Sequence, residues 1–188
     1  MDFEKLFENK YKDFKATFRE TSFDPRNDKY LCNSEKEKNL FNFDKIVKIK
    51  FPKKQPSSVD SILIKNKKIY CIEFKNSTAK KIKNDNIRKK HHNSADILTQ
   101  ICNENKIDKT KYEFIYCVVF KPYKIQSKRF SNRASKYKNK IRKQKEQKSA
   151  VTSNILFGLE NENNEFYQEV ITKNVNEFAR YYVKYKNK

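Results

Sequence analysis

The chain has 188 residues, the length of one domain, and its 44 Lys and Arg against 23 Asp and Glu give a formal net charge of +21. Such a charge attracts polyanions, although it also fits a ribosome-associated protein or a protein that binds membrane surfaces. The single glycine leaves no glycine-rich phosphate loop, which excludes the Rossmann-type dinucleotide-binding and Walker-type nucleotide-binding classes.

The N-terminal part of the chain predicts two helices separated by a loop. Phenylalanines at helical spacing predict one amphipathic helix over residues 2–19. Residues 21–33 contain Pro25 and several turn-forming residues, so we expect a loop there. Ser34 and Glu37 have the spacing of a capping box, which predicts a shorter helix over residues 34–43.

Three strands are predicted in succession after these helices, over residues 45–51, 59–64 and 69–74. Apolar residues at helical spacing then predict a helix over residues 79–104. Residues 112–120 form the most apolar strand candidate of the chain. The order helix, three strands, helix, strand predicts an α/β fold.

The composition changes at Lys121, since 12 of the 28 residues over 121–148 are Lys or Arg. This stretch predicts a basic arm, either helical or a loop. Beyond it, residues 154–160 and 165–173 predict a closing hairpin and residues 174–185 a final helix. We therefore expect one domain with an N-terminal helix and loop (1–33), a core (34–120), the arm (121–148) and a C-terminal hairpin and helix (149–188).

The cysteines and the apolar runs indicate the compartment of the protein. Four widely separated cysteines without C-x-x-C spacing predict buried, reduced thiols: Cys32, Cys71, Cys102 and Cys117. No apolar run reaches the roughly 18 residues of a membrane span, and the N-terminus lacks the apolar core of a signal peptide. We expect an intracellular protein, in the cytoplasm or nucleoid or, if phage- or virus-encoded, inside the host cell.

Asp60, Glu73 and Lys75 fall in the predicted hairpin, where a small core needs apolar residues. A turn of two or four residues around 66–67 gives the same register, in which the numbers of paired residues sum to 133. Asp60 then faces Glu73, and Lys75 lies on the same face. Opposed acids about 4.5–5.5 Å apart destabilise a sheet unless one carboxyl is protonated or a cation lies between the two.

A hard divalent ion is one cation that could fill this position. Mg²⁺ takes carboxylate and carbonyl oxygens and keeps several waters, so two acids at a strand end make a shell that stays open to phosphate. Lys75 could then orient a water nucleophile or offset developing charge. In the structural alternative, Asp60 begins a strand at the surface, Glu73 faces solvent, and Lys75 only pairs with Glu73.

The motif formed by Asp60 and, after twelve residues, Glu73-Phe74-Lys75 resembles the PD-(D/E)xK nuclease superfamily, although Val59 stands where the motif's name has proline. The resemblance covers residues 34–120. It implies a restriction-endonuclease-like core with the order αβββαβ, in which helices flank a mixed central sheet. The basic arm and the C-terminal strand and helix would then be additions to that core.

The same resemblance implies roles for individual residues. Asp60, Glu73 and the Phe74 carbonyl would be ligands of Mg²⁺, for which Mn²⁺ could substitute, and Lys75 would assist the nucleophilic water. Since many members of the superfamily supply a further acid from the helix before the first strand, Glu37 is a fourth candidate ligand. Its alternative role is that of capping-box partner to Ser34.

The basic segments around the motif predict nucleic-acid contacts, because Lys and Arg bind phosphates and interspersed aromatic residues can stack on bases. The predicted contacts are Lys80, Lys81, Arg88, Lys89, Lys90, His92, Lys128, Arg129, Arg133, Lys136, Arg142 and Lys143. We expect His91 at the surface beside His92. Gln100 is either a substrate-orienting residue or an ordinary polar residue of the helix.

Together these features predict an Mg²⁺-dependent endonuclease that hydrolyses phosphodiester bonds, in DNA rather than RNA, without a membrane partner. A structure-selective nuclease similar to Holliday-junction resolvases, acting as a homodimer, is an alternative within this class, as is a sequence-specific enzyme. RNA stays open as a substrate, because phosphate contacts hardly distinguish the two sugars. The alternative from another class is a non-catalytic basic nucleic-acid-binding protein.

Overall fold

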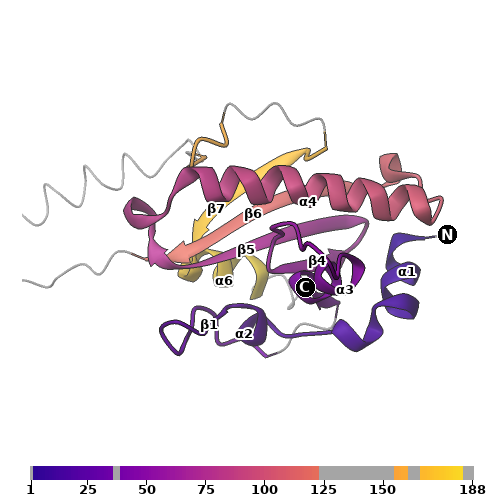
Figure 1. Ribbon diagram of the computed structural model, residues 1–188. Helices are drawn as coiled ribbons and strands as arrows, with labels where there is room; N and C mark the ends of the chain where they lie inside the picture. Colours follow the sequence, from indigo (N-terminus) through magenta and orange to yellow (C-terminus); the bar gives the residue numbers. More distant parts are fainter. Residues whose placement is uncertain (1, 36–38, 123–154, 161–165, 184–188) are drawn as a thin grey trace, which may run out of the picture. The chain divides into compact units, whose positions relative to one another are not determined.

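A computed structural model describes residues 2–35, 39–122, 155–160 and 166–183 (Figure 1). They belong to one of two units of the chain, residues 1–122 with 155–188, and the other unit, 123–154, lies outside the described residues. Also outside them are the candidate ligand Glu37 and six predicted nucleic-acid contacts: Lys128, Arg129, Arg133, Lys136, Arg142 and Lys143.

A mixed five-stranded sheet lies at the centre of the described unit, in the order β3-β4-β5-β6-β7. The strands are β3 (Leu40–Asn42), β4 (Ser61–Lys65), β5 (Lys68–Thr78), β6 (Glu113–Lys121) and β7 (Glu169–Asn174). β3, β4 and β5 pair antiparallel, whereas β5, β6 and β7 pair parallel. With helices on both faces of this sheet, the predicted α/β class is confirmed (Figure 1).

Helices surround the sheet, and a small separate hairpin precedes it. The α-helices are α1 (Phe3–Lys10), α2 (Phe18–Thr21), α3 (Phe43–Lys50), α4 (Asn84–Glu104) and α6 (Val175–Val183). The 3₁₀ helices are η1 (Lys12–Phe14), η2 (Ala79–Lys81) and η3 (Lys109–Lys111). The hairpin pairs β1 (Phe23–Asp24) with β2 (Lys29–Tyr30) inside the predicted loop 21–33.

The two faces of the sheet bury different helices. α1, α3 and α4 share one apolar core, to which Val47 of α3 and Leu98 of α4 contribute. On the opposite face, Phe18 of α2 and Phe178 of α6 pack with Ile72 of β5. Since neighbouring residues of a strand point to opposite faces, odd-numbered residues of β5 up to Lys75 face α4 and even-numbered ones face α6.

The β4–β5 hairpin has the predicted register, as the pairing of Ile62 with Cys71 illustrates. Asn66 and Lys67 form its turn with φ angles of 52° and 62°. Positive φ at both central residues is what a two-residue type I′ turn requires, and asparagine tolerates it well. The predictions of strands at 59–64, 69–74 and 112–120 and of a helix at 79–104 are confirmed within a few residues.

The prediction of a single helix over residues 2–19 is wrong. α1 ends at Lys10, and the backbone then turns to bond β3, with the Ala16 N–H donating to the Leu40 carbonyl at 2.9 Å. Thr17 begins α2 in a capping box with Glu20. The cap and the bond to the strand satisfy backbone groups that a continuous helix would have used, so the helix is interrupted there.

The predicted helix over 34–43 and strand over 45–51 are also wrong in their described residues, which exclude 36–38. Residues Leu40–Asn42 form a strand where a helix was expected, because their backbone completes the edge of the sheet beside β4. The expected strand over 45–51 lies largely in helix α3. Asn42 caps this helix by accepting the Lys45 N–H at 3.0 Å. In a strand, Val47 and Ile49 would point to the same face and be buried together, whereas in a helix they point in different directions. Val47 is buried and Ile49 is 65% exposed, as a helix requires.

The predicted C-terminal hairpin is absent from the described residues. β7 pairs parallel to β6, and residues 155–160 form turns instead of a strand. Phe157 and Leu159 of that segment nevertheless pack in the core on the α4 face. Helix α6 follows β7 directly, because the Asn174 side chain accepts the N–H groups of Asn176 and Glu177, and the predicted final helix is confirmed.

The four cysteines are buried and form no disulfide, as predicted. Burial raises the pKa of the Cys102 thiol to about 11, which keeps it protonated at neutral pH. Within the described ranges, each helix is too short or too polar to cross a lipid bilayer.

Candidate active site

Asp60 lies one residue before β4 and is bonded through its backbone to β5 on one side and to the first residue of α3 on the other. Its N–H donates to the Ile72 carbonyl at 3.1 Å, and its carbonyl accepts the Phe43 N–H at 3.1 Å. The bond from Phe43 extends the β3–β4 register by one residue, whereas the bond to Ile72 reaches the residue already paired with Ser61, where the regular β4–β5 pairing ends. The position of Asp60 is therefore fixed by the sheet and by the start of α3.

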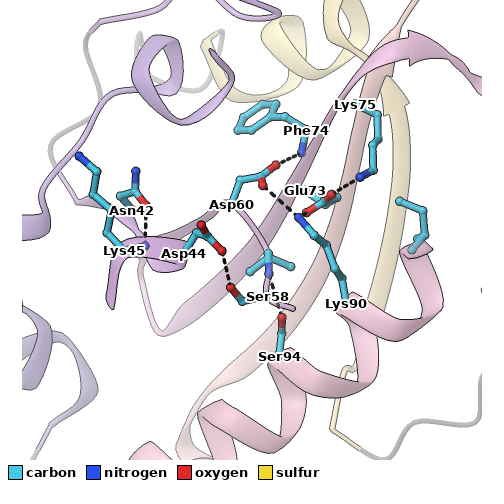
Figure 2. Close-up of polar contacts among 12 residues, drawn as sticks. Asn42, Asp44, Lys45, Ser58, Asp60, Glu73, Phe74, Lys75, Lys90 and Ser94 are labelled. Atoms are coloured by element: carbon cyan, nitrogen blue, oxygen red, sulfur yellow. Dashed lines mark hydrogen bonds and ion pairs between the residues drawn. The ribbon is translucent and has the colours of Figure 1, made fainter. Parts of the chain in front are cut away.

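The segment that leads into Asp60 is held by two helices (Figure 2). The Val59 N–H donates to Ser94 Oγ of α4 at 3.0 Å. Ser58 Oγ donates to Asp44 Oδ1 of α3 at 3.0 Å. Ser58 and Ser94 are fully buried, and the bond between Val59 and Ser94 is shielded from water. Asp44 Oδ1 also accepts from Gln55, which gives this acid an anchoring role.

Glu73 lies on β5 and is fully buried, on the face of the sheet that α4 covers. Asp60 approaches it from the end of the neighbouring strand. Asp60 Oδ2 accepts the Phe74 N–H at 2.6 Å, which fixes the carboxylate over the middle of β5. The expectation that Glu73 faces solvent, part of the structural alternative, is therefore wrong.

A single ammonium group joins the two acids (Figure 2). Lys90 Nζ of α4 lies 2.8 Å from Glu73 Oε2 and 3.2 Å from Asp60 Oδ1. Lys75 Nζ lies 2.6 Å from Glu73 Oε1, on the other side of that carboxylate. Asp60, Glu73, Lys75 and Lys90 thus form a charged cluster with two acids and two bases. The predicted cation between the acids is, in this structure, Lys90.

Burial sets the protonation of the charged cluster. Desolvation, followed by repulsion from Glu73, raises the pKa of Asp60 to about 7 against the opposing effects of Lys90 and the Phe74 N–H. For Lys90, burial by itself lowers the pKa, but attraction to Asp60 and Glu73 outweighs it, and the pKa lies above its ordinary value. Lys90 is therefore charged at neutral pH.

The oxygens of the cluster fit a hard divalent ion. Glu73 Oε1 is buried and accepts no hydrogen bond among the described residues, since the Lys75 contact is an ion pair without hydrogen-bond geometry. Asp60 is 25% exposed, which leaves the pair open to solvent on one side. The Phe74 carbonyl points to the same side of β5 as its N–H, towards Asp60. Carboxylate and carbonyl oxygens of this kind are the ligands that Mg²⁺ prefers.

No third metal-ligating side chain completes the pair within the described ranges, where no group of three Asp, Glu, His or Cys residues could hold an ion. An open shell of this kind leaves positions for water and phosphate.

The geometry of β5 changes directly after Lys75, because the β5–β6 register shifts between Lys75 and Thr78. Such bulges bend a strand and re-aim its side chains, often beside active sites.

The predicted phosphate contacts of the described unit separate into two groups. Five are exposed on η2 and the first half of α4, directly after β5: Lys80, Lys81, Arg88, Lys89 and His92. Lys90 is the exception, because it points into the charged cluster. The sequence offers a signal for this: Lys90 follows the buried Ile87 by three residues and precedes the buried Ser94 by four, which places it on the inward stripe of α4.

Two other polar residues of α4 form contacts outside the charged cluster. His91 is buried instead of exposed, with its ring centroid 4.8 Å from that of Tyr116 and 4.7 Å from that of Tyr167. Gln100 is exposed and donates to Glu104 at 2.8 Å. It follows Lys90 by ten residues, about 15 Å along a helix, which places it away from the charged cluster.

Protein-family models, curated proteins and solved structures were compared with this chain, and none matches it. The chemistry of the site is therefore inferred from its geometry.

Proposed function

We propose that this chain is a divalent-metal-dependent endonuclease that hydrolyses phosphodiester bonds, with DNA as its substrate. The observation that carries the proposal is the convergence of Asp60 and Glu73, from adjoining strands, on one cation position with Lys75 beside it. Buried ion clusters are weak contributors to stability compared with apolar packing. A cluster of this kind at a strand end is better explained by catalysis than by folding.

The element order supports a restriction-endonuclease-like core. Three antiparallel strands, β3 to β5, are followed by α4 and by β6, which is parallel to β5. This is the strand and helix order that the resemblance to PD-(D/E)xK nucleases implies. In this proposal, α3 is an insertion between the first two strands, and β7 with α6 is an addition after the core.

Each residue of the motif has a distinct role in the proposed reaction. Asp60, Glu73 and the Phe74 carbonyl would hold Mg²⁺ or Mn²⁺. When bound, such an ion supplies Lewis-acid activation of water and neutralises charge on the phosphate. Lys75, a compact charge with three donors, orients the attacking water and stabilises charge on the phosphoryl oxygens. Lys75 lies on the same face of β5 as Glu73, two residues further along the strand, so its stem reaches that acid.

The basic surface beside the site would hold the substrate. Lys80, Lys81, Arg88 and Lys89 are exposed on the segment that follows β5 and leads into the helix of Lys90. Cations in this position bind phosphates of the backbone independently of sequence. The formal charge of +21 adds long-range attraction to a polyanion.

The test is cleavage of plasmid DNA, single-stranded DNA and RNA with Mg²⁺, Mn²⁺ or EDTA. Glu73→Gln keeps the size of the side chain and removes its charge, and we expect it to lower the cleavage rate by about a thousandfold or more. Glu169→Gln, on an exposed position of β7, is the matched control and should cut like the wild type. Cleavage that persists at the wild-type rate in Glu73→Gln would reject the assignment.

The same assay separates the alternatives. Salt-sensitive binding without a metal-dependent product would identify a non-catalytic nucleic-acid-binding protein. A rate that is highest on branched DNA, together with a dimer on gel filtration, would identify a structure-selective nuclease. Metal-dependent cleavage confined to RNA would reject DNA as the substrate but would support metal-dependent hydrolysis of phosphodiester bonds.

A further inference from the structure

The ammonium group of Lys90 occupies the place where the two acids meet (Figure 2). Its Nζ contacts one oxygen of each acid, Glu73 Oε2 at 2.8 Å and Asp60 Oδ1 at 3.2 Å. Its side chain is 22% exposed, and on α4 it lies between the exposed Lys89 and the buried His91, so part of it reaches solvent. The Lys90 ammonium can therefore bind both acids in one rotamer and move away from them into solvent in another.

A divalent ion held by the same two acids would compete with Lys90. Oxygen ligands lie about 2.0–2.1 Å from Mg²⁺, so an ion shared by both acids would lie between them, where the Lys90 ammonium now contacts one oxygen of each. With both acids ionised, the charged cluster is neutral, because two carboxylates face two lysines. Adding a divalent ion would leave it with two excess positive charges, and repulsion between cations favours the departure of Lys90.

We infer that Lys90 closes the carboxylate pair in the metal-free protein and is displaced from it when a divalent cation binds. This inference rests on the proposed metal-dependent function. A lysine is easier to displace than an arginine, because its charge is compact and its stem is flexible. An arginine would bind a carboxylate through two parallel hydrogen bonds. The buried neighbours Ile87 and Ser94 hold the helix in place, so only the side chain has to move.

Displacement of Lys90 links metal binding to substrate binding. The released ammonium lies beside the site and needs a new anionic partner, which a phosphate of the nucleic acid supplies. Each ligand therefore removes an obstacle to the other, and by linkage the assistance is mutual. In the free protein, Lys90 lowers the affinity for metal and keeps the acids paired.

The test is calorimetric titration of Mg²⁺ into the full chain without nucleic acid. Lys90→Met removes the charge but keeps an unbranched apolar stem, and we expect it to bind Mg²⁺ roughly 5- to 100-fold more tightly than the wild type. Lys89→Met is the matched control, because it removes the same charge from an exposed neighbouring position. It should stay within about twofold of the wild type, since exposed charges are screened by salt.

A second measurement keeps the inference testable if Lys90→Met is unstable. Lys90→Gln retains hydrogen-bond donors without the charge, and its melting temperature should rise more on addition of Mg²⁺ than that of the wild type. Equal Mg²⁺ affinities for the wild type and both Lys90 variants, or weaker binding by the variants, would overturn the displacement of Lys90.

The outcomes also distinguish this inference from the proposed function. Unchanged Mg²⁺ affinity in the Lys90 variants, alongside wild-type cleavage that depends on Glu73, rejects the role of Lys90 and leaves the nuclease standing. If neither the wild type nor the variants bind Mg²⁺ or Mn²⁺, the metal-dependent function fails and the inference fails with it. Tighter binding in the Lys90 variants together with an inactive wild type supports the inference and rejects the nuclease.

Discussion

One face of β5 contains two different environments against the same helix. In its first half, Ile69 and Cys71 pack with α4 in the apolar core. Further along the same face, Glu73 and Lys75 meet Lys90 of α4 in the charged cluster. Apolar burial stabilises a fold, whereas a buried ion cluster is often no better than apolar residues of similar size. The first half of β5 therefore serves folding, and the second half is where the proposed function places the metal ligands.

The apolar half should show the largest effect on stability. Ile62 of β4 is fully buried opposite Cys71, and Ile62→Ala leaves a cavity there. We expect the free energy of unfolding to fall by about 2–5 kcal/mol in urea denaturation. Ile62→Val should lose only about 0.5–1.5 kcal/mol. If both variants match the wild type, this half of the hairpin does not hold the fold.

The charged cluster should behave in the opposite way when it is replaced as a whole. The variant combines four changes: Asp60→Leu, Glu73→Leu, Lys75→Met and Lys90→Met. Its free energy of unfolding in EDTA should equal that of the wild type or exceed it by about 1–4 kcal/mol, because no charge remains to be desolvated. Mg²⁺ should no longer change its melting temperature. A loss of stability as large as that of Ile62→Ala would show that the cluster serves folding after all.

The pH dependence of stability should come from the charged cluster and not from the apolar half. Asp60 faces Glu73 and Lys75 of β5 and Lys90 of α4, and its pKa is raised to about 7 from an ordinary value of 3.8. The folded chain therefore holds this proton to higher pH than the unfolded chain does. Stability is then greatest near the acidic end and falls as the pH rises from about 4 to 7.

This loss can be measured by urea denaturation in EDTA at several pH values. We expect a decrease on the order of 2 kcal/mol between pH 5 and pH 8 in the wild type, which Asp60→Asn should largely remove. Mg²⁺ should reverse the trend, since the ionised carboxylate is the form that binds it. Identical pH profiles for the wild type and Asp60→Asn would contradict the raised pKa.

The hairpin could be predicted from sequence because its signals are local. Alternating apolar residues set the faces of β4 and β5, and a turn at Asn66 and Lys67 set the register, so the approach of Asp60 to Glu73 followed from residue numbers alone. Lys90 is different, because its contact with the acids depends on how α4 lies across the sheet. Helical spacing places it on the inward stripe but cannot say which strand it meets.

The errors over residues 34–51 have another physical cause. Apolar residues at 46, 47, 49 and 51 satisfy both a strand and a helical pattern, and such short runs are not resolved by periodicity. The deciding feature is Asn42, whose side chain caps α3 and ends β3. The parallel pairing of β7 with β6 escaped prediction as well, because it joins segments about 50 residues apart in the chain.

A substitution at Asn42 should give the smallest change in stability among these variants and still distinguish the charged half of the hairpin from the apolar half. Helix α3, which Asn42 caps, holds the charged half in place through the bond from the Phe43 N–H to the Asp60 carbonyl. Asn42→Ala removes the cap, and the free energy of unfolding should fall by about 1 kcal/mol. Asn42→Asp keeps an acceptor at the helix start and should stay close to the wild type. Hydrogen exchange separates the two halves of the hairpin: the Phe43 amide should exchange faster in Asn42→Ala, while the amides of Ile62 and Cys71 keep their protection. Equal acceleration at all three amides would mean that the charged and apolar halves open as one unit, and that α3 has no separate part in positioning Asp60.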